Sequence, residues 1–312
     1  MVSLPHRSQA RILILLTRRL LLGLLTASAA LTLAFFITRL VGTDPVDSLL
    51  AQGLTSVEQA NALRHRLGLD QSLLNQYISY GSNLLRGDLG FSLYTQRPVL
   101  TIILEQFRWT LGLALTGLFI GVTFGFVLGI AAAWWEQNRW GRFAAATASL
   151  LTAIPVAVTG ILALWLAITL QIRGAHLLLP GTVLGLATCG PIARLIYTHL
   201  SESLQAPYIL AAYARGIRRG KRLLWHALRP VLPPIVSLIA LEAAFLFAGT
   251  VVTETVFSRP GLGRLMVRAV LDGDYPISQG LVALAALIYT ASHVIADGLA
   301  LIFDPRLRED VS

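Results

Sequence analysis

The hydrophobic positions of the chain gather in long runs, and polar segments separate these runs. The hydrocarbon core of a bilayer is about 30 Å thick and an α-helix rises about 1.5 Å per residue, so a span needs roughly 20 apolar residues. Six runs reach that length, at residues 20–40, 110–133, 144–170, 178–197, 234–256 and 279–303. The pattern predicts an all-α polytopic membrane protein with about six transmembrane helices, the last five of which form a core at 110–303.

The first run also has features of a cleavable signal peptide. Arg18 and Arg19 precede an apolar stretch that contains Ala27, Ser28 and Ala29 in a cleavable-looking pattern. The apolar stretch continues well past the length of a signal-peptide core, and five further runs follow it. We therefore expect this run to remain as the first span.

The composition agrees with a membrane protein. Of the 312 residues, 55% are hydrophobic and 13% are charged, whereas a soluble domain carries about 25% charged residues. The formal net charge of +9 does not indicate a nucleic-acid partner, because the lysines and arginines are scattered between the apolar runs. Cys189 is the only cysteine, which excludes an intrachain disulfide and a thiolate metal cluster.

The positions of the lysines and arginines predict how the chain is oriented, since cytoplasmic loops are enriched in them. Most of them lie in the N-terminal segment 1–19, the loop around Arg139, the loop 198–229 and the tail 304–312. We expect these segments, and hence both termini, on the cytoplasmic side. The long loop 41–109 is then extracytoplasmic.

We expect the extracytoplasmic loop to be folded, because its acidic and basic residues nearly balance. Ser56 and Gln59 resemble a capping box that opens a helix, and Gly68 suits the position just after that helix ends. Residues 72–85 are amphipathic enough to form a second helix. A disordered tether is the alternative.

The loop at 198–229 carries the clearest local signals. Pro207 suits the first turn of a helix, where its missing N–H is not needed, and Gly216 suits the left-handed position after a helix ends. A helix at 207–215 is too short to be stable alone in water, so we expect a partner to hold it. For the basic residues that follow, from Arg215 to Arg222, a partner is one explanation, and membrane topology together with anionic lipid headgroups is an equally good one.

A short cytoplasmic helix that ends in glycine, between the fourth and fifth of six spans, is similar to the coupling helix of ABC importer permeases. The family pattern is Glu-Ala-Ala, three residues and Gly, and this chain has Leu210, Ala211, Ala212 and Gly216 in the corresponding places. The glutamate is absent, and Pro207 stands where the family usually has an acidic residue.

Further motifs follow the order of the family along nearly the whole chain. They are Thr43-Asp44-Pro45, Gly87-Asp88-Leu89-Gly90, His226-Ala227-Leu228-Arg229, Glu254-Thr255-Val256-Phe257, Pro260-Gly261-Leu262-Gly263 and Asp274-Tyr275-Pro276. The chain therefore resembles the first permease subunit of binding-protein-dependent importers for dipeptides, oligopeptides or nickel.

The resemblance implies the type I ABC importer permease fold and a transport subunit of the cell inner membrane, not an enzyme. Its implied partners in the bilayer are a second homologous permease subunit, two ATPase subunits and an extracytoplasmic solute-binding protein. The sequence has no Gly-x-x-x-x-Gly-Lys-Ser/Thr phosphate loop. ATP and Mg²⁺ are therefore expected on the partner ATPase, with no cofactor on this chain.

The resemblance and the local pattern together predict the residues that contact the ATPase. They are Tyr208, Ala211, Ala212, Arg215 and Gly216.

Two carboxylates inside the fifth apolar run need an explanation, because a charge at mid-bilayer costs about 2.5–3.5 kcal/mol on insertion scales. We interpret Glu242 as a residue of the translocation path or as a structural buried carboxylate. Glu254 belongs to one of the family motifs and is interpreted as a residue that organises the gate-side loop.

Two other functional classes are the alternatives. A self-contained secondary transporter or channel would move solute without ATP and usually has more spans or an internal repeat. A membrane-embedded enzyme would need paired carboxylates or metal-binding histidines, and the sequence has no His-Glu-x-x-His spacing. The substrate stays open between short peptides, nickel or metal chelates, and other small solutes.

Overall fold

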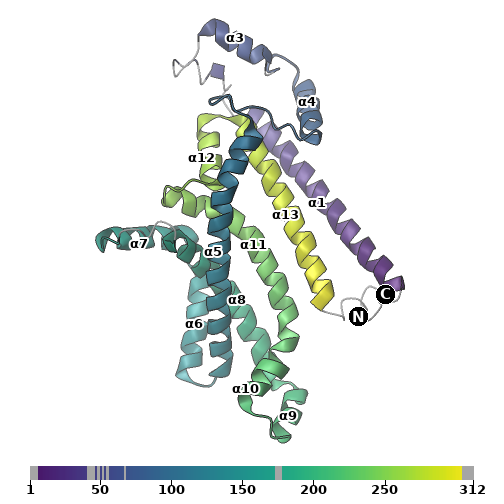
Figure 1. Cartoon of the computed structure of the whole chain (residues 1–312), viewed down its shortest axis with the longest axis vertical. Helices are drawn as coiled ribbons and strands as arrows, with labels where there is room; N and C mark the ends of the chain where they lie inside the picture. The colour runs from purple at the N-terminus through teal and green to yellow at the C-terminus, as the bar shows by residue number, and fades with distance from the viewer. Residues whose placement is uncertain are drawn as a thin grey trace. The chain divides into compact units, whose positions relative to one another are not determined.

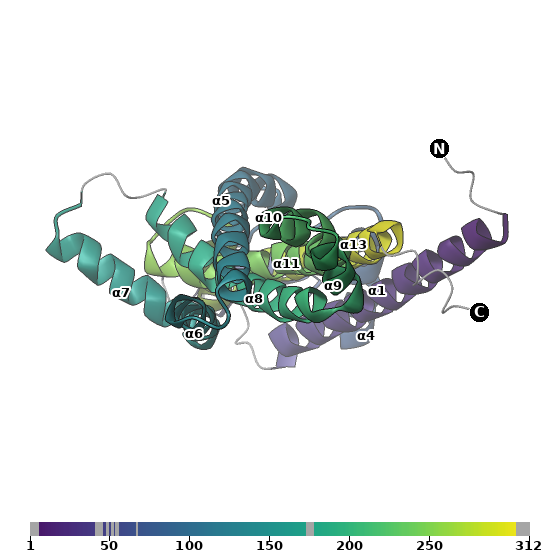
Figure 2. The same ribbon diagram turned by 90° about the horizontal axis from the view of Figure 1, so that it is seen from below.

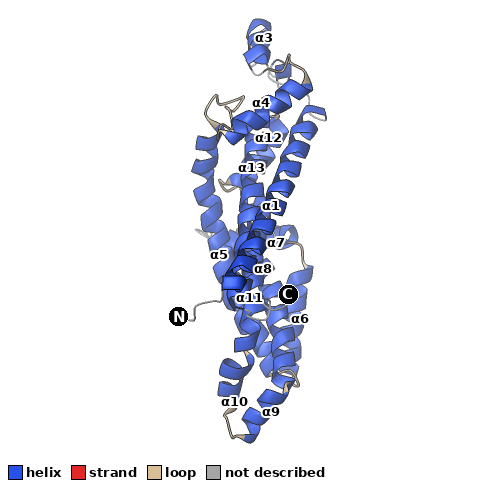
Figure 3. Cartoon of the chain, turned by 90° about the vertical axis from the view of Figure 1, so that its right-hand side faces the viewer, coloured by secondary structure: helices blue, strands red, loops and turns tan. Residues whose placement is uncertain are grey.

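The computed structural model describes residues 6–40, 46–47, 50, 53, 56–66, 68–172 and 178–303. Within these ranges the regular elements are helices, and extended backbone pairs only at an isolated bridge between Phe91 and Pro98 (Figure 3). The chain divides into two compact units, each assembled from separate stretches. Unit 1 comprises the described parts of Met1–Leu22, Leu111–Arg259 and Tyr289–Ser312, and unit 2 those of Gly23–Thr110 and Pro260–Ile288.

Among the described residues, five helices are long and apolar enough to cross a membrane, or six spans result if one bent pair is counted as a span. The five spans correspond to α1 (His6–Leu40), α5 (Val99–Trp134), α8 (Leu178–Gln205), α11 (Leu232–Val256) and α13 (Tyr275–Phe303), and the helical stretch that ends with α11 begins already at Arg219. These helices extend beyond the apolar runs that predicted them; α5, for example, begins well before residue 110. Hydropathy marks only the part of a helix that is apolar, while the helical hydrogen bonding continues into polar residues.

The third predicted span, residues 144–170, is not one straight helix. It consists of α6 (Arg139–Ala153) and α7 (Val156–Thr169), which meet at an angle of 100°. The bend follows from Pro155, because proline pushes the preceding residue out of the helical region, and Ile154 has an extended ψ of 122°. The prediction of a single continuous helix here was wrong because the proline was not treated as a break.

In unit 1, a stripe of small residues brings α5 and α8 into close contact (Figure 1). Gly117, Gly121, Gly125 and Gly129 recur every fourth residue on one face of α5. A Cβ atom added to Gly125 would lie 2.9 Å from the Cβ of Ile192, and similar clashes arise at the other three. Small residues at this spacing let two helix backbones approach closely, which is how helices associate where lipid removes the hydrophobic driving force.

The main core of unit 1 lies where α8 meets the loop that follows it. Ile192, Ile196 and Leu200 of α8 are fully buried and pack in one cluster with Ile209, Leu223 and Ala227. Figure 2 shows α9 (Pro207–Ala214) and α10 (Arg219–Lys221) beside the end of α8. The loop at 198–229 is therefore a packed part of unit 1.

Unit 2 contains the described part of the long loop, with α3 (Val57–Arg66), α4 (Leu73–Leu85) and also α12 (Leu262–Asp272). The predicted capping box is confirmed, because the backbone N–H of Ser56 donates to Gln59 at 3.1 Å and the N–H of Gln59 donates to the Ser56 hydroxyl at 3.3 Å. The second predicted helix is confirmed as α4, with Ser72 as its N-cap. Gly68 has the left-handed φ of +64° that a helix end requires.

A buried carboxylate connects the hairpin-like loop before α5 to the start of α13 in unit 2. Asp274 is 3% exposed and accepts hydrogen bonds from the Ser92 hydroxyl at 2.6 Å and the Leu93 N–H at 3.3 Å. Burial raises the pKa of the Asp274 carboxyl, although these hydrogen bonds act in the opposite direction. The Asp274-Tyr275-Pro276 motif thus has a structural role, because its carboxylate anchors a loop nearly two hundred positions earlier.

Replacing Gly129 with alanine should destabilise unit 1. The new Cβ would lie 2.7 Å from the backbone oxygen of Ala193, which cannot move unless the helices separate. Overpacking of this kind costs about 1–3 kcal/mol, so the thermal unfolding midpoint in detergent should fall. Gly112→Ala on the same helix is the matched control, because nothing lies within 4 Å of its Cβ position. Equal midpoints for the two variants would contradict the close α5–α8 contact.

Candidate functional site

The short helix predicted in the loop at 198–229 is confirmed as α9, Pro207–Ala214. Pro207 occupies its first turn, as expected for a residue without an N–H. Gly216 has a φ of +73°, and its N–H donates to the Tyr213 oxygen while the Ile217 N–H donates to the Ala212 oxygen. These two bonds form a Schellman motif, which satisfies carbonyl groups that a helix end otherwise leaves unpaired.

The two faces of α9 have different environments. Ile209 and Ala212 are 6% and 5% exposed and face the core of unit 1. Tyr208, Leu210 and Tyr213 are 47%, 69% and 64% exposed. Ala212 was predicted to lie on the partner-facing surface, but it packs inside the chain, because its side of α9 faces the core of unit 1.

The other residues predicted to contact an ATPase are accessible. Ala211, Arg215 and Gly216 are exposed, as is Tyr208. Together with Leu210 and Tyr213, which the prediction did not include, they form a mostly apolar ridge that we call the α9 ridge. Isolated apolar residues on a surface are ordinary, but a contiguous group on a short helix indicates a protein contact.

A single serine joins α9 to its neighbours. The Ser203 hydroxyl, on α8, donates to the Ala227 oxygen at 2.9 Å and is hydrogen-bonded to the Tyr208 hydroxyl at 2.6 Å. Ala227 ends a π-helix, Arg222–Ala227, of the kind that is rare and often found at functional sites. Ser203 is buried, so α8, α9 and the π-helix move together unless these bonds break.

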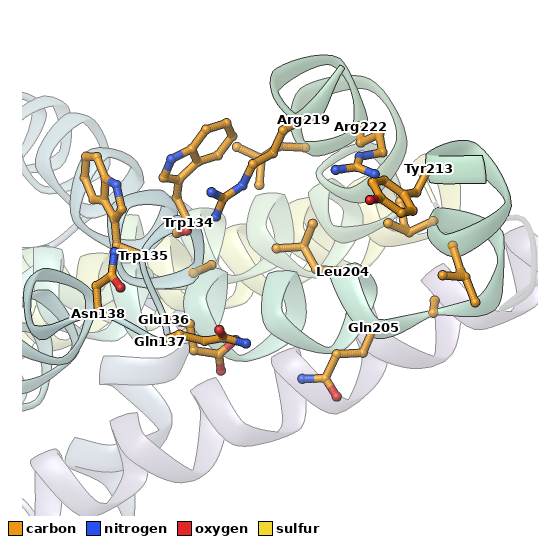
Figure 4. A pocket seen from close by; sticks show the side chains of 15 residues that line it. Trp134, Trp135, Glu136, Gln137, Asn138, Leu204, Gln205, Tyr213, Arg219 and Arg222 are labelled. Carbon is orange, nitrogen blue, oxygen red and sulfur yellow. Dashed lines mark hydrogen bonds between the residues drawn. The ribbon is translucent and has the colours of Figure 1, made fainter. Parts of the chain in front are cut away.

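A hollow of about 820 Å³ opens beside α9, between the end of α5 and the π-helix (Figure 4). The Arg219 guanidinium lies over the Trp134 ring at 4.4 Å and donates a hydrogen bond to the Trp134 oxygen. The Arg222 guanidinium lies over the Tyr213 ring at 4.6 Å. Part of the basic run is therefore occupied in holding the loop against α5.

The chemistry of this region suits binding rather than catalysis. Aromatic, aliphatic and guanidinium groups dominate its surface, and such residues are enriched at protein interfaces. In the part of the chain that the structure describes, no group of three or more His, Cys, Asp or Glu side chains is placed to hold a metal ion.

The two carboxylates of α11 do not form one site. Glu242 is partly buried and Glu254 is fully buried, at 0% exposure. They lie on the same helix, twelve positions apart, which corresponds to roughly 18 Å at about 1.5 Å per residue. The oxygen of the Glu254 backbone accepts from the Arg259 N–H at 2.8 Å, in the turn that ends the helix. Their predicted roles in a path or gate stay predictions.

Sequence comparison decides which family this architecture represents. The model of the family described as "Binding-protein-dependent transport system inner membrane component" matches residues 121–309, more than half of the chain. The chain belongs to this family. It is also 33% identical over 298 residues to the glutathione transport system permease protein GsiC of Escherichia coli K12, covering 92% of this chain and 97% of that protein. The Salmonella typhimurium protein of the same name is 34% identical over the same length.

Solved structures show the same fold. An amino acid ABC transporter crystallised with histidines matches with a TM-score of 0.51 and 14% identity, over 66% of this chain and 94% of that one. The inward-facing MetNI methionine ABC transporter matches with a TM-score of 0.51 and 18% identity, over 64% and 97%. The chain is a permease component of an ABC importer, and ATP hydrolysis by such importers lies in a separate subunit.

Sequence reasoning about this permease missed the groups that hold α9 in place. These groups are Ser203, Trp134 and the π-helix, and all of them lie outside the segment that matches the Glu-Ala-Ala pattern. The His226-Ala227-Leu228-Arg229 motif overlaps the end of the π-helix, but the motif alone does not show that the Ala227 oxygen accepts a hydrogen bond from Ser203.

Replacing Ser203 with alanine should loosen α9 on unit 1. The change removes this partner from the Ala227 oxygen, which is buried, and from the Tyr208 hydroxyl, which is only partly buried. Loss of a partner costs about 1–3 kcal/mol for a buried group. Hydrogen–deuterium exchange of the amides of α9 should become faster. Ser237→Ala is the control, because the Ser237 hydroxyl donates to Pro233 within its own helix at 3.2 Å. Unchanged exchange in the Ser203 variant would show that Ser203 does not fix α9.

Proposed function

We propose that this chain is the permease through which an ATP-driven importer takes up short peptides of the glutathione class. The observation that carries the proposal is the α9 ridge, an exposed apolar surface on a helix whose opposite face is fixed in the core of unit 1. When a partner that binds the exposed face moves, such a helix transmits the displacement to the core of unit 1. Membership of the family supplies the partners in general terms, namely an ATPase and a binding protein in a membrane complex.

The transmission of force follows from the contacts of α9. When an ATPase groove grips the ridge around Tyr208 and Tyr213, closure of the ATPases displaces α9. The bond network of Ser203 and the burial of Ile209 oblige α8 to follow. The glycine stripe then carries the motion from α8 to α5, because packed helices shift as rigid bodies.

The names of the relatives support peptides as the substrate. The relatives that this chain matches along almost their whole length are named glutathione transport permeases, and glutathione is a tripeptide. Nickel complexes, the other class that the sequence left open, are the comparison substrate in the experiment below.

The assembly that we propose contains this chain, a second homologous permease, two ATPase subunits and an extracytoplasmic binding protein. ATP and Mg²⁺ belong to the ATPases. The distribution of lysine and arginine supports cytoplasmic termini, so α9 would meet the ATPases on the cytoplasmic side and unit 2's loop would meet the binding protein.

The deciding experiment is uptake into vesicles that hold the complete assembly, with glutathione, triglycine and chelated nickel offered in parallel. We expect peptide uptake that requires both ATP and the binding protein. Uptake that an ion gradient drives without ATP would instead show a secondary transporter. Uptake of chelated nickel but of neither peptide would overturn the substrate assignment.

Replacing Gly216 with valine should uncouple ATP hydrolysis from uptake. There is open space around Gly216, so the effect comes from its φ of +73°, a conformation that costs a residue with a side chain about 1–2 kcal/mol. The end of α9 should distort, and uptake should fall several-fold while ATP hydrolysis continues. Gly220→Val is the matched control, because its Cβ also meets nothing within 4 Å and its φ is not in the left-handed region. Equal uptake by both variants would argue against coupling through α9.

Cysteine labelling tests the orientation. The native Cys189 is 1% exposed and should react little. We expect a membrane-impermeant maleimide to label Tyr213→Cys only in inside-out vesicles and Leu85→Cys only in right-side-out spheroplasts, since the two native side chains are 64% and 91% exposed. Labelling with the opposite sidedness would place α9 outside the cell and contradict the proposed function.

A further inference from the structure

Unit 2 contains a hollow of about 360 Å³ that lies apart from the α9 ridge. Its walls come from α4, the loop after α4, the end of α1 and the first turns of α13. The size falls in the range of small-molecule pockets, about 300–1,000 Å³, and is sufficient for a ligand of the size of a short peptide. Polar side chains contribute much of its lining, among them Gln76, Tyr80, Arg39 and Asp88.

Two buried polar atoms in this hollow lack hydrogen-bond partners in the described structure. They are the side-chain oxygen of Gln76 and the hydroxyl of Tyr80, one turn apart on α4. The Gln76 amide nitrogen donates to the backbone oxygens of Gln71 at 3.0 Å and Leu69 at 3.4 Å, which fixes the oxygen on the other side. Leaving such atoms unpaired costs about 1–3 kcal/mol each, so something polar is expected to occupy the hollow.

The charges around the hollow match a ligand with both a donor and an acceptor end. The Arg39 guanidinium is held over the Phe35 and Tyr275 rings at 5.4 and 5.5 Å and brings a positive charge to the wall. Asp88 brings a carboxylate, whose position is fixed by a hydrogen bond from the Gly90 N–H at 2.8 Å. Burial, with Tyr77 nearby, raises the pKa of Tyr80 to about 12, so its phenol stays a hydrogen-bond donor.

We propose that this hollow is a binding site for zwitterionic solutes of amino-acid or short-peptide type. The carboxylate of the ligand pairs with Arg39 and accepts from Tyr80, while its ammonium or amide N–H groups donate to Gln76 and Asp88. The site rests on the proposed function, because it would hold the imported class of solute at unit 2 independently of the binding protein. The volume of about 360 Å³ suits a small molecule better than a protein loop as the occupant.

The test uses the complete transporter in lipid nanodiscs, without the binding protein and with triglycine as the probe. Saturation-transfer NMR should detect triglycine binding, and Tyr80→Phe should weaken it about threefold to tenfold through loss of one hydrogen bond. Tyr77→Phe is the matched control: it removes the same atom from the same helix, but the Tyr77 hydroxyl is hydrogen-bonded to Thr32 at 2.8 Å. Equal affinity of the two variants would overturn the proposal.

A second measurement places the ligand even if Tyr80→Phe is unstable. Ser79 lines the hollow, whereas Leu85 on the same helix does not. Triglycine should protect Ser79→Cys from a maleimide and leave Leu85→Cys reactive, and its C-terminal amide, which lacks the carboxylate, should protect less. No protection by triglycine at millimolar concentration would show that water alone fills the hollow. Protection only when the binding protein is added would show a protein loop as the occupant and would equally overturn the proposal.

These results are separable from the vesicle experiment on the proposed function. ATP-driven peptide uptake without protection of Ser79→Cys would leave the function standing and remove the site. Protection by triglycine in a transporter that imports only chelated nickel would keep the site and remove the proposed substrate.

Discussion

The contact between α5 and α8 is the constraint on which the rest of unit 1 depends. Lipid provides no hydrophobic driving force between helices, so these two are held by close packing of backbones. Four glycines at every fourth position of α5 make that approach possible, and a single added Cβ atom would meet a backbone oxygen of α8. Since α8 continues into the core that holds α9, a displacement of either helix changes the position of the exposed α9 ridge.

The position of α9 combines two opposite requirements. A short helix is not stable alone, and burying its inner face at Ile209 and Ala212 supplies the missing stability. Its outer face must stay accessible and apolar to engage another protein, which in an isolated chain leaves Leu210 and Tyr213 in water. The sequence alone suggested that a partner protein must hold α9. Because the chain's own core stabilises the helix, a partner is needed less for the folding of α9 than for covering its outer surface.

Much of the fold was predictable because membrane spans and helix ends have local causes. Five of the six apolar runs correspond to single long helices, Ser56 and Gln59 predicted a cap, and Pro207 with Gly216 predicted α9 within one residue. The break at Pro155 was equally local and was missed because hydropathy averages over it. What no sequence pattern indicated were the contacts between distant segments, such as Ser203 with Ala227, Ser92 with Asp274, and Arg219 with Trp134.

The two candidate sites show why residue type alone predicted one and missed the other. The α9 ridge can be found from sequence because α9 has a local motif. The small residues and the glycine at its end are required by backbone geometry within about ten consecutive positions. The hollow in unit 2 has no motif: Arg39, Gln76 and Tyr80 come from two helices and look like ordinary interfacial residues in sequence. Only the three-dimensional structure shows that two buried oxygens, those of Gln76 and Tyr80, have no hydrogen-bond partner among the described residues. Unpaired polar groups are what a binding site for solute needs, because groups already hydrogen-bonded to the chain's own side chains would contribute no affinity for solute.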